Sequence, residues 1–589
     1  MKNRLKTLII ILILTIFSLA VYPGYGVFAE DHLAWIPVLY ASMNHSLFTR
    51  DLVLGVSAVR FSFFNQFIAG FMNLFKTNIF TSLFVLDFLA RLIAIYSFYE
   101  IGLYFTGSGF LSFIFAFLAS TGLSVYGTTT STFDIRLVPR TISLPLALLA
   151  LSFILKNQYF IAALTLGFSL FFHFLTVIPF LGFFYAALLF FSDKSNRKKI
   201  FFGILPVLFL AFLVFNMPAN HLNIFSYVDR AWEAIMRAQD PELFITSWPG
   251  RGVYLQLLAT AVIFFLGLFK LKDYLSKENK KYIYLLFFIP LLAFLVAFVG
   301  ADILKLHLII ELQLARALIM WRLVVLLILL IWINKNFSEQ SDWFYNFLLL
   351  GLTAAFILRE NFMYLFLPPL ILDFILGSMF HYKQKFQYYI WALFLVLLAI
   401  FLGLLIFVKK FGSLNYLYWI IGISAAIILA VAFWGWDKFL SKKTFILFLT
   451  VLIIFIIILL PKFTIKPAYL NDENFNGLCA WVKNNTPTSA MFIVAPFSSS
   501  GEQFRISCLK NIFFSRIDGM QSFFDRDYAM EWQKRLDLIS KINQNPDYLK
   551  NVVREYDINY ILSERNLHLN NPPVFSNNRY FVYKLDNQQ

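Results

Sequence analysis

The chain has 589 residues, of which 60% are hydrophobic and 14% are charged, and its formal net charge is +16. Soluble globular proteins are roughly 45–50% apolar and about 25% charged, so this composition excludes an ordinary soluble enzyme. Apolar runs of roughly 17–25 residues recur along the chain, and each is long enough to cross a hydrocarbon core about 30 Å thick. A transmembrane β-barrel is excluded because it would show short strands of alternating hydropathy.

The first apolar run covers about residues 5–22 and follows the basic segment M-K-N-R-L-K-T. It is similar to a signal peptide, but it is long and no clear A-x-A cleavage site follows it. These features predict a retained signal anchor with a cytoplasmic N-terminus. We expect fifteen membrane spans in total, within a range of thirteen to fifteen. The other fourteen lie near residues 79–98, 109–125, 141–155, 158–173, 175–192, 200–216, 252–270, 282–300, 317–335, 343–358, 362–380, 387–408, 415–434 and 444–460.

Loop charge predicts the orientation of these spans. With the N-terminus inside, the loops that face the cytoplasm are the basic ones, as the positive-inside rule requires, at residues 193–199, 270–281, 381–385 and 437–443. Lys409 and Lys410 are the clear exception. The long mixed loops then face outside, at residues 22–76, 126–140, 217–251 and 301–316. An odd number of spans puts the C-terminus on that same side.

The composition changes sharply after residue 461. We therefore expect a transmembrane domain over 1–461 and an extracytoplasmic α/β domain over 462–589. Helices are predicted near 472–485, 524–542 and 546–556, and strands near 491–495, 511–515, 558–562 and 580–585. Because the tail is nearly neutral, the positive charge lies in the membrane part, which argues against a nucleic-acid partner.

Both cysteines of the chain, Cys479 and Cys508, fall in the tail. Outside the cytoplasm a disulfide is permitted, and two free buried thiols are an equally open alternative. No Cys/His ligand spacing surrounds them, so the sequence predicts no metal site here.

The first outer loop, residues 23–78, carries the polar triplet Glu30-Asp31-His32 just before the amphipathic segment L-A-W-I-P-V-L-Y. A carboxylate held at the membrane surface can take a proton from an acceptor hydroxyl as a general base. It can also bind a divalent cation such as Mg or Mn. The alternative is a solvated turn with helix-capping acids. Asp51, about twenty residues later, is a further candidate for substrate binding, or else a cap or a brace.

Two arginines, Arg136 and Arg140, stand four residues apart at the mouth of a span on the same side as Asp31. On a helix they would share a face, and two guanidiniums suit a phosphate or pyrophosphate group. The alternative is pairing with Asp134 or snorkelling to lipid headgroups.

Ionisable groups at the ends of apolar spans supply the remaining candidates. His173 lies near the outer end of its predicted span, although a lone histidine is often only structural. Arg316 and Arg322 flank or enter the span that begins L-A-R-A-L-I-M-W-R, and either can contact a lipid phosphate. Asp87 and Arg91, four apart in one span, are explained by a structural ion pair.

Three short segments give the chain a family resemblance through their motifs: E-D-H and R-D-L in the first, within residues 30–52, F-D-I-R-L-V-P-R in the second, at 133–140, and L-C-A-W-V-K-N-N-T-P in the third, at 478–487. With the acidic first loop, the many spans and the outer α/β tail, the chain resembles the GT-C superfamily of membrane glycosyltransferases. The third motif is similar to a segment in the tails of uncharacterised bacterial relatives of that superfamily.

The resemblance implies inverting transfer of a sugar from a polyprenyl-phosphate carrier, at the outer face of a bacterial inner membrane. It puts the catalytic base at Asp31 or Glu30. By their chemistry, the candidates for substrate contacts are His32, Asp51, Arg136, Arg140, His173, Arg316 and Arg322. Membrane lipids are the other expected partners. The alternatives are a non-enzymatic transporter or lipid-handling protein, and a catalytically degenerate family member.

Overall fold

A computed structural model describes residues 2–371 and 470–585, apart from 21–22, 29, 56–61, 126, 192–201, 216–225, 249, 339–342, 359–362, 364–365, 369, 471, 495–498, 545–547 and 568–570. The predicted spans near 387–408, 415–434 and 444–460, and part of the one near 362–380, lie outside the described residues.

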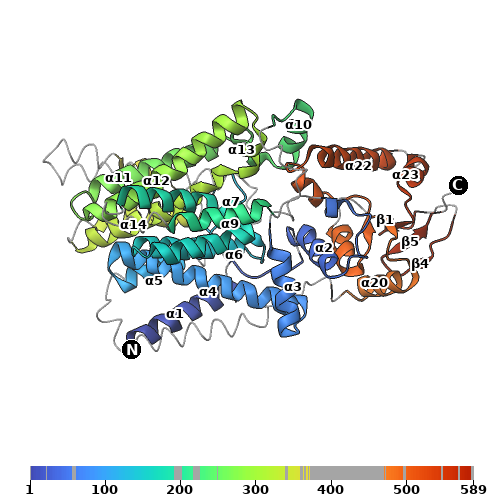
Figure 1. Cartoon of the computed structure of the whole chain (residues 1–589), viewed down its shortest axis with the longest axis horizontal. Coiled ribbons are helices and arrows are strands. Elements are labelled where there is room, and N and C mark those ends of the chain that lie inside the picture. Colours follow the sequence, from blue (N-terminus) through green and yellow to red (C-terminus); the bar gives the residue numbers. More distant parts are fainter. Residues whose placement is uncertain are drawn as a thin grey trace.

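Among the described residues, five helical stretches are long and apolar enough to cross a membrane. They contain α4 (Ile79–Thr106), α7 (Tyr159–Phe191), α11 (Arg251–Lys270), α12 (Lys277–Ala297) and α14 (Ile319–Ser338). Other helices of the same part are α1 (Lys2–Ala20), α5 (Gly109–Ala119), α6 (Pro139–Leu155), α9 (Ile204–Phe215) and α15 (Trp343–Leu358). The helices form a bundle along the long axis of the molecule (Figure 1). The chain thus has the fold of a helical membrane protein with a small C-terminal sheet domain.

Where the structure describes the predicted runs, most helices begin and end within a few residues of them, but α4 extends to Thr106 where 79–98 was predicted and α5 ends at Ala119 where 109–125 was predicted. The largest difference is at α7. Residues 158–173 and 175–192 were expected to form two spans, but they form the single helix α7, with a backbone break at His173 (φ −157°, ψ 90°). The break frees carbonyl groups that the first outer loop uses. The Phe63 amide donates to the Phe171 carbonyl, and the Ser62 hydroxyl donates to the Phe172 carbonyl.

The segments between the long helices fold into short helices rather than open loops. The first outer loop contains α2 (His32–Met43), η1 (Leu52–Gly55) and α3 (Phe64–Phe75). The outer loop at 217–251 contains α10 (Arg230–Gln239), capped by Asp229, whose side chain accepts from two backbone amides. The other short elements are η4 (Pro241–Leu243), η5 (Ile245–Ser247), η6 (Phe298–Ile303), α13 (His307–Leu312) and η7 (Leu314–Leu318).

The tail folds around a five-stranded sheet in the order β2-β1-β3-β5-β4. Strands β1 (Met491–Ile493), β2 (Asn511–Ile512) and β3 (Tyr560–Ser563) are parallel, and β5 (Phe581–Lys584) and β4 (Phe575–Ser576) add to them antiparallel. The tail helices are α20 (Glu473–Asn485), α21 (Ser499–Cys508), η11 (Ile517–Gln521), α22 (Arg526–Gln544) and α23 (Tyr548–Tyr556). A disulfide between Cys479 and Cys508 joins α20 to α21.

The sheet domain lies at the end of the bundle opposite the N-terminus, beside α2, α3 and α10 (Figure 1). Apolar side chains of α10 and α22 share one buried cluster. The indole of Trp232 donates to the Ser522 carbonyl, and the His307 ring contacts the Phe523 carbonyl at 2.9 Å. The tail is therefore docked against the outer loops by packing and by hydrogen bonds.

A second attachment is a fully buried ion cluster that we call the clamp: Arg505, Asp51 and Asp518. One guanidinium nitrogen of Arg505 donates to Asp51 at 3.1 Å and to Asp518 at 2.8 Å. The other donates to the Leu33 carbonyl of α2 at 2.7 Å. The clamp joins the first outer loop to two elements of the tail.

Candidate functional site

A cavity of about 300 Å³ lies at the junction between the bundle and the tail. Its walls come from the start of α2, the loop before α6, the break in α7, and the short elements η4, η7 and η11. Six of the nine predicted site residues line it: Glu30, Asp31, Arg136, Arg140, His173 and Arg316. Residues scattered over almost three hundred positions thus meet at one place.

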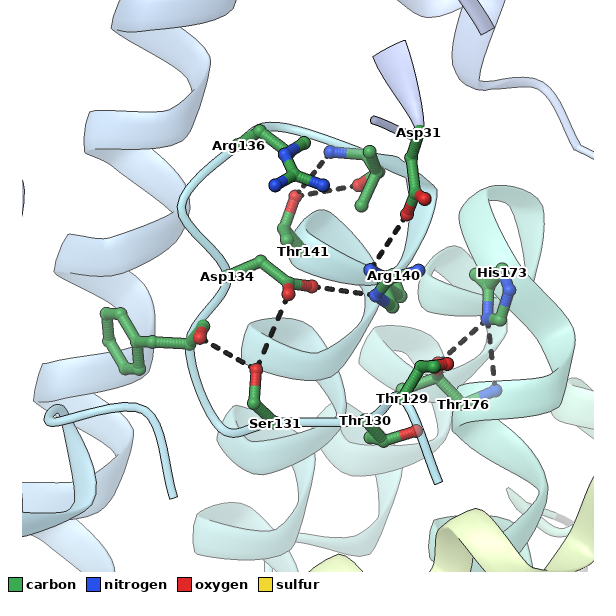
Figure 2. A network of polar contacts seen from close by, with 12 residues as sticks. Asp31, Thr129, Thr130, Ser131, Asp134, Arg136, Arg140, Thr141, His173 and Thr176 are labelled. Atoms are coloured by element: carbon green, nitrogen blue, oxygen red, sulfur yellow. Dashed lines mark hydrogen bonds and ion pairs between the residues drawn. The ribbon is translucent and has the colours of Figure 1, made fainter. Parts of the chain in front are cut away.

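Arg140 is the centre of the charged wall. Its guanidinium contacts the carboxylate of Asp31 at 2.9 Å and that of Asp134 at 2.7 Å. Figure 2 shows Arg140 lying between these two acids. Asp31 stands at the N-cap position of α2, but its side chain makes no capping hydrogen bond. The helix-capping alternative therefore does not explain Asp31.

Arg136 and Arg140 do not share a helix face. Helix α6 begins at Pro139, whose fixed φ suits the first position of a helix, so Arg136 remains in the preceding loop. Its side chain is buried and contacts the carboxylate of Glu30 at 2.5 Å. Glu30 itself is 73% exposed and has a left-handed φ of 44°. Each arginine thus holds one acid of the Glu30-Asp31 pair.

The charge state of Asp31 follows from its neighbours. Burial alone would raise the pKa of its carboxyl, but Arg140 and Arg136 outweigh that effect, so the pKa lies below its ordinary value. Asp31 is therefore an ionised carboxylate at neutral pH, which is the form that a general base requires.

His173 reaches the cavity because α7 breaks at this residue. Its Nδ1 atom lies 2.8 Å from the Thr176 hydroxyl and accepts a 3.3 Å hydrogen bond from the Thr176 amide (Figure 2). That amide donor identifies Nδ1 as an acceptor, which leaves the proton of a neutral ring on Nε2. His173 can offer one N–H donor to a ligand.

Arg316, in η7, differs from the other two arginines of the cavity. Within the described part of the chain its side chain makes no hydrogen bond and no ion pair within 4.0 Å. Its guanidinium therefore keeps its full donor capacity for a bound anion.

Three predicted site residues lie outside the cavity. His32 is buried, where its ring accepts from the Phe28 amide and contacts the Leu137 carbonyl at 2.7 Å. Asp51 belongs to the clamp, and its second oxygen accepts from the Ile512 amide. Arg322 is buried in α14, where it donates to the Phe356 carbonyl and lies over the Phe356 ring. All three have structural contacts in place of access to the cavity.

Several polar residues that line the cavity were not among the predicted site residues, and they include Asp240, Gln313 and Gln521. Asp240 follows α10, Gln313 joins α13 to η7, and Gln521 ends η11 in the tail. Asp240 carries a charge that a sequence search can flag. An isolated glutamine gives no sequence signal.

Among the residues that the structure describes, no group of three or more His, Cys, Asp or Glu side chains is placed to hold a metal ion. The two acids closest to Arg140 already share its positive charge.

Comparison with known proteins gives no match to a family model, to a curated protein or to a solved structure. The functional argument therefore depends on the residues of the cavity.

Proposed function

We propose that this chain is a membrane glycosyltransferase of the GT-C type, which transfers a sugar from a polyprenyl-phosphate carrier to an envelope acceptor. The observation that carries the proposal is the meeting of Asp31 with Arg136, Arg140, His173 and Arg316 around one cavity at the ends of the apolar helices. A lipid-linked donor needs a site near the ends of the apolar helices, so that its headgroup can enter the cavity while its polyprenyl chain stays in the membrane.

In this proposal Asp31 takes the proton of the acceptor hydroxyl, and the resulting nucleophile attacks the anomeric carbon from the side opposite the phosphate. Glu30, exposed at the rim, is the second candidate for the base. Arg316 and, after rearrangement, Arg136 and Arg140 stabilise the negative charge on the departing phosphate. The acids that now neutralise Arg136 and Arg140 keep those charges compensated when no phosphate is bound.

The arrangement of the molecule supports the proposed topology. The N-terminus and the sheet domain lie at opposite ends of the bundle (Figure 1). This fits a cytoplasmic N-terminus and an extracytoplasmic tail in a bacterial inner membrane, with thirteen to fifteen spans over the full chain. The disulfide in the tail fits an oxidising compartment.

The test is transfer by the purified full chain in liposomes, supplied with a panel of polyprenyl-phosphate sugars and membrane-derived acceptors and followed by mass spectrometry. Asp31→Asn should lower the transfer rate about 10²–10⁴-fold, the usual contribution of a general base. The matched control is Asp273→Asn, because Asp273 is exposed in the loop between α11 and α12. Full activity of Asp31→Asn would overturn the assignment, and lipid binding without transfer would favour the lipid-handling alternative.

A further inference from the structure

Three side chains that line the cavity, those of Asp240, Gln313 and Gln521, each bury an oxygen atom without a hydrogen-bond partner in the described part of the chain. Asp240 is 3% exposed and Gln521 is 9% exposed, and the unpartnered atoms are Asp240 Oδ2 and Gln521 Oε1. The side-chain oxygen of Gln313 is also buried without a partner. Buried polar groups in folded proteins are bonded in the large majority of cases. Three exceptions around one cavity therefore require an explanation.

The backbone at one of these residues adds a second observation. Gln313 has a left-handed φ of 46°, a conformation that is uncommon for residues other than glycine. Such strain persists where the surroundings impose it, often at ligand sites. Gln313 is the residue that joins α13 to η7, and both Gln313 and Arg316 line the cavity.

Asp240 is the ionisable member of this group of residues. Burial raises the pKa of the Asp240 carboxyl well above its ordinary value, and the nearby acids Glu242 and Asp31 raise it further, against the opposing effect of Arg316. A protonated carboxyl and two amides each offer both a donor and an acceptor. Side chains that both donate and accept hydrogen bonds suit the hydroxyl groups of a ligand, which also do both.

Apolar side chains line the same cavity. They include Trp35, Met520, Phe523 and Phe524. A carbohydrate ring has hydroxyl groups at its edge and C–H groups on its faces, so it fits a wall of amides and aromatic rings.

We propose that Asp240, Gln313 and Gln521 form a subsite for the hydroxylated ring of a carbohydrate, in the same cavity as the charged cluster around Arg140. The inference rests on the proposed function and assigns the tail, through Gln521, a direct part in binding the sugar. The ring belongs either to the lipid-linked donor or to the acceptor.

The experiment measures binding to the full chain in a detergent without a sugar headgroup, so that no turnover is required. The probes are methyl glycosides of hexoses, pentoses and N-acetylhexosamines, together with polyprenyl phosphate and polyprenyl-phosphate sugars. The variants are Gln521→Leu and Asp240→Leu, with Gln533→Leu on α22 as the matched control, since Gln533 makes an exposed hydrogen bond to Asp537 in its own helix.

Both variants should weaken binding of a sugar probe at least about tenfold, because each removes hydrogen bonds that only the ligand satisfies. They should also keep or raise the unfolding temperature, since an unpaired buried polar group is replaced by an apolar one. A loss confined to methyl glycosides would assign the ring to the acceptor. A loss for the polyprenyl-phosphate sugar, but not for bare polyprenyl phosphate, would assign it to the donor.

The inference is overturned if no sugar probe binds, or if Gln521→Leu and Asp240→Leu bind the probes as the wild type does. It is also overturned if both variants lower the unfolding temperature markedly while Gln533→Leu does not, because the side chains would then be structural. Sugar binding without any transfer would count against the proposed function alone, and transfer unaffected by the variants would count against the subsite alone.

Discussion

Two clusters in this molecule have the same composition, one arginine between two aspartates. In the cavity Arg140 contacts Asp31 and Asp134, and in the clamp Arg505 contacts Asp51 and Asp518. Their surroundings differ. The side chains of the cavity cluster are 15–20% exposed, whereas those of the clamp are at most 2% exposed.

This difference in exposure distinguishes a candidate functional site, the cavity cluster, from a structural ion cluster, the clamp. In the clamp the acids have further fixed partners, since Asp51 also accepts from the Ile512 amide. No ligand can reach these groups without opening the tail. In the cavity the same ion pairs border open space, so their charges can be redistributed around a bound group. Access, rather than the kind of ion pair, identifies the functional cluster.

The largest expected effect comes from breaking the clamp. Arg505→Leu leaves the Asp51 and Asp518 carboxylates buried without a cation, which should lower the free energy of unfolding by about 3–5 kcal/mol. Thermal unfolding of the full chain and proteolytic release of the tail measure this. The control is Arg526→Leu, which breaks the exposed pair with Asp229 and should cost at most about 1 kcal/mol. Equal effects of the two changes would mean that the clamp does not hold the tail.

The disulfide should have the next largest effect, because Cys508 lies on the helix that carries Arg505. Reduction, or replacement of both cysteines by alanine, should cost about 2–4 kcal/mol. The unfolding temperature with and without reductant measures the effect. The alanine variant should no longer respond to reductant, and an unchanged response would point to another target.

The clamp holds two carboxylates and one guanidinium, so its stability should depend on pH. Burial raises the pKa of Asp518 to about 6, with Asp51 and Glu502 adding to the shift and Arg505 opposing it. The unfolded chain titrates near 3.8, so the folded state binds this proton more tightly. The contribution of Asp518 to stability should therefore fall as pH rises from about 4 to about 6 and then stay level. Asp518→Asn should remove that fall, and identical profiles for wild type and variant would contradict it.

A smaller stability effect is expected at the cavity cluster. Arg140→Leu should cost about 1 kcal/mol, because Asp31 and Asp134 remain partly exposed and stay solvated. The same change should raise the pKa of Asp31 toward its ordinary value, since Arg140 is its main opposing charge. The acidic limb of the transfer rate would then move to higher pH. A stability loss as large as that of Arg505→Leu would remove the distinction between the two clusters.

The fold was predictable wherever length or periodicity carried the signal. The apolar runs of α4, α11 and α12 have the required length, and the tail strands β1 and β3 show short buried patterns. Helix α21 was missed because it begins S-S-G-E, a composition typical of a loop. Its position depends on contacts made elsewhere in the fold, including those of Arg505.

The site was predictable only in part. Charged residues at the outer ends of spans were expected on one side of the membrane, and the structure brings Asp31, Arg140 and Arg316 to one cavity. For Asp51 the sequence left substrate binding and a bracing role open, and the structure agrees with the brace; its partner, Arg505, lies 454 positions away, so no local pattern could decide between the two. The Gln521 side-chain oxygen lacks a partner only because of how the tail packs in the folded molecule. No local sequence pattern predicts this.

The comparison of Asp31→Asn with Asp51→Asn tests the central claim most directly, because both aspartates belong to the first outer loop. The measurement is the sugar-transfer rate per folded molecule, with the unfolding temperature recorded on the same preparations. Asp31→Asn should unfold like the wild type but transfer sugar about 10²–10⁴-fold more slowly, and Asp51→Asn should unfold at a lower temperature while its folded fraction remains active. An inactive but stable Asp51→Asn beside an active Asp31→Asn would contradict the central claim.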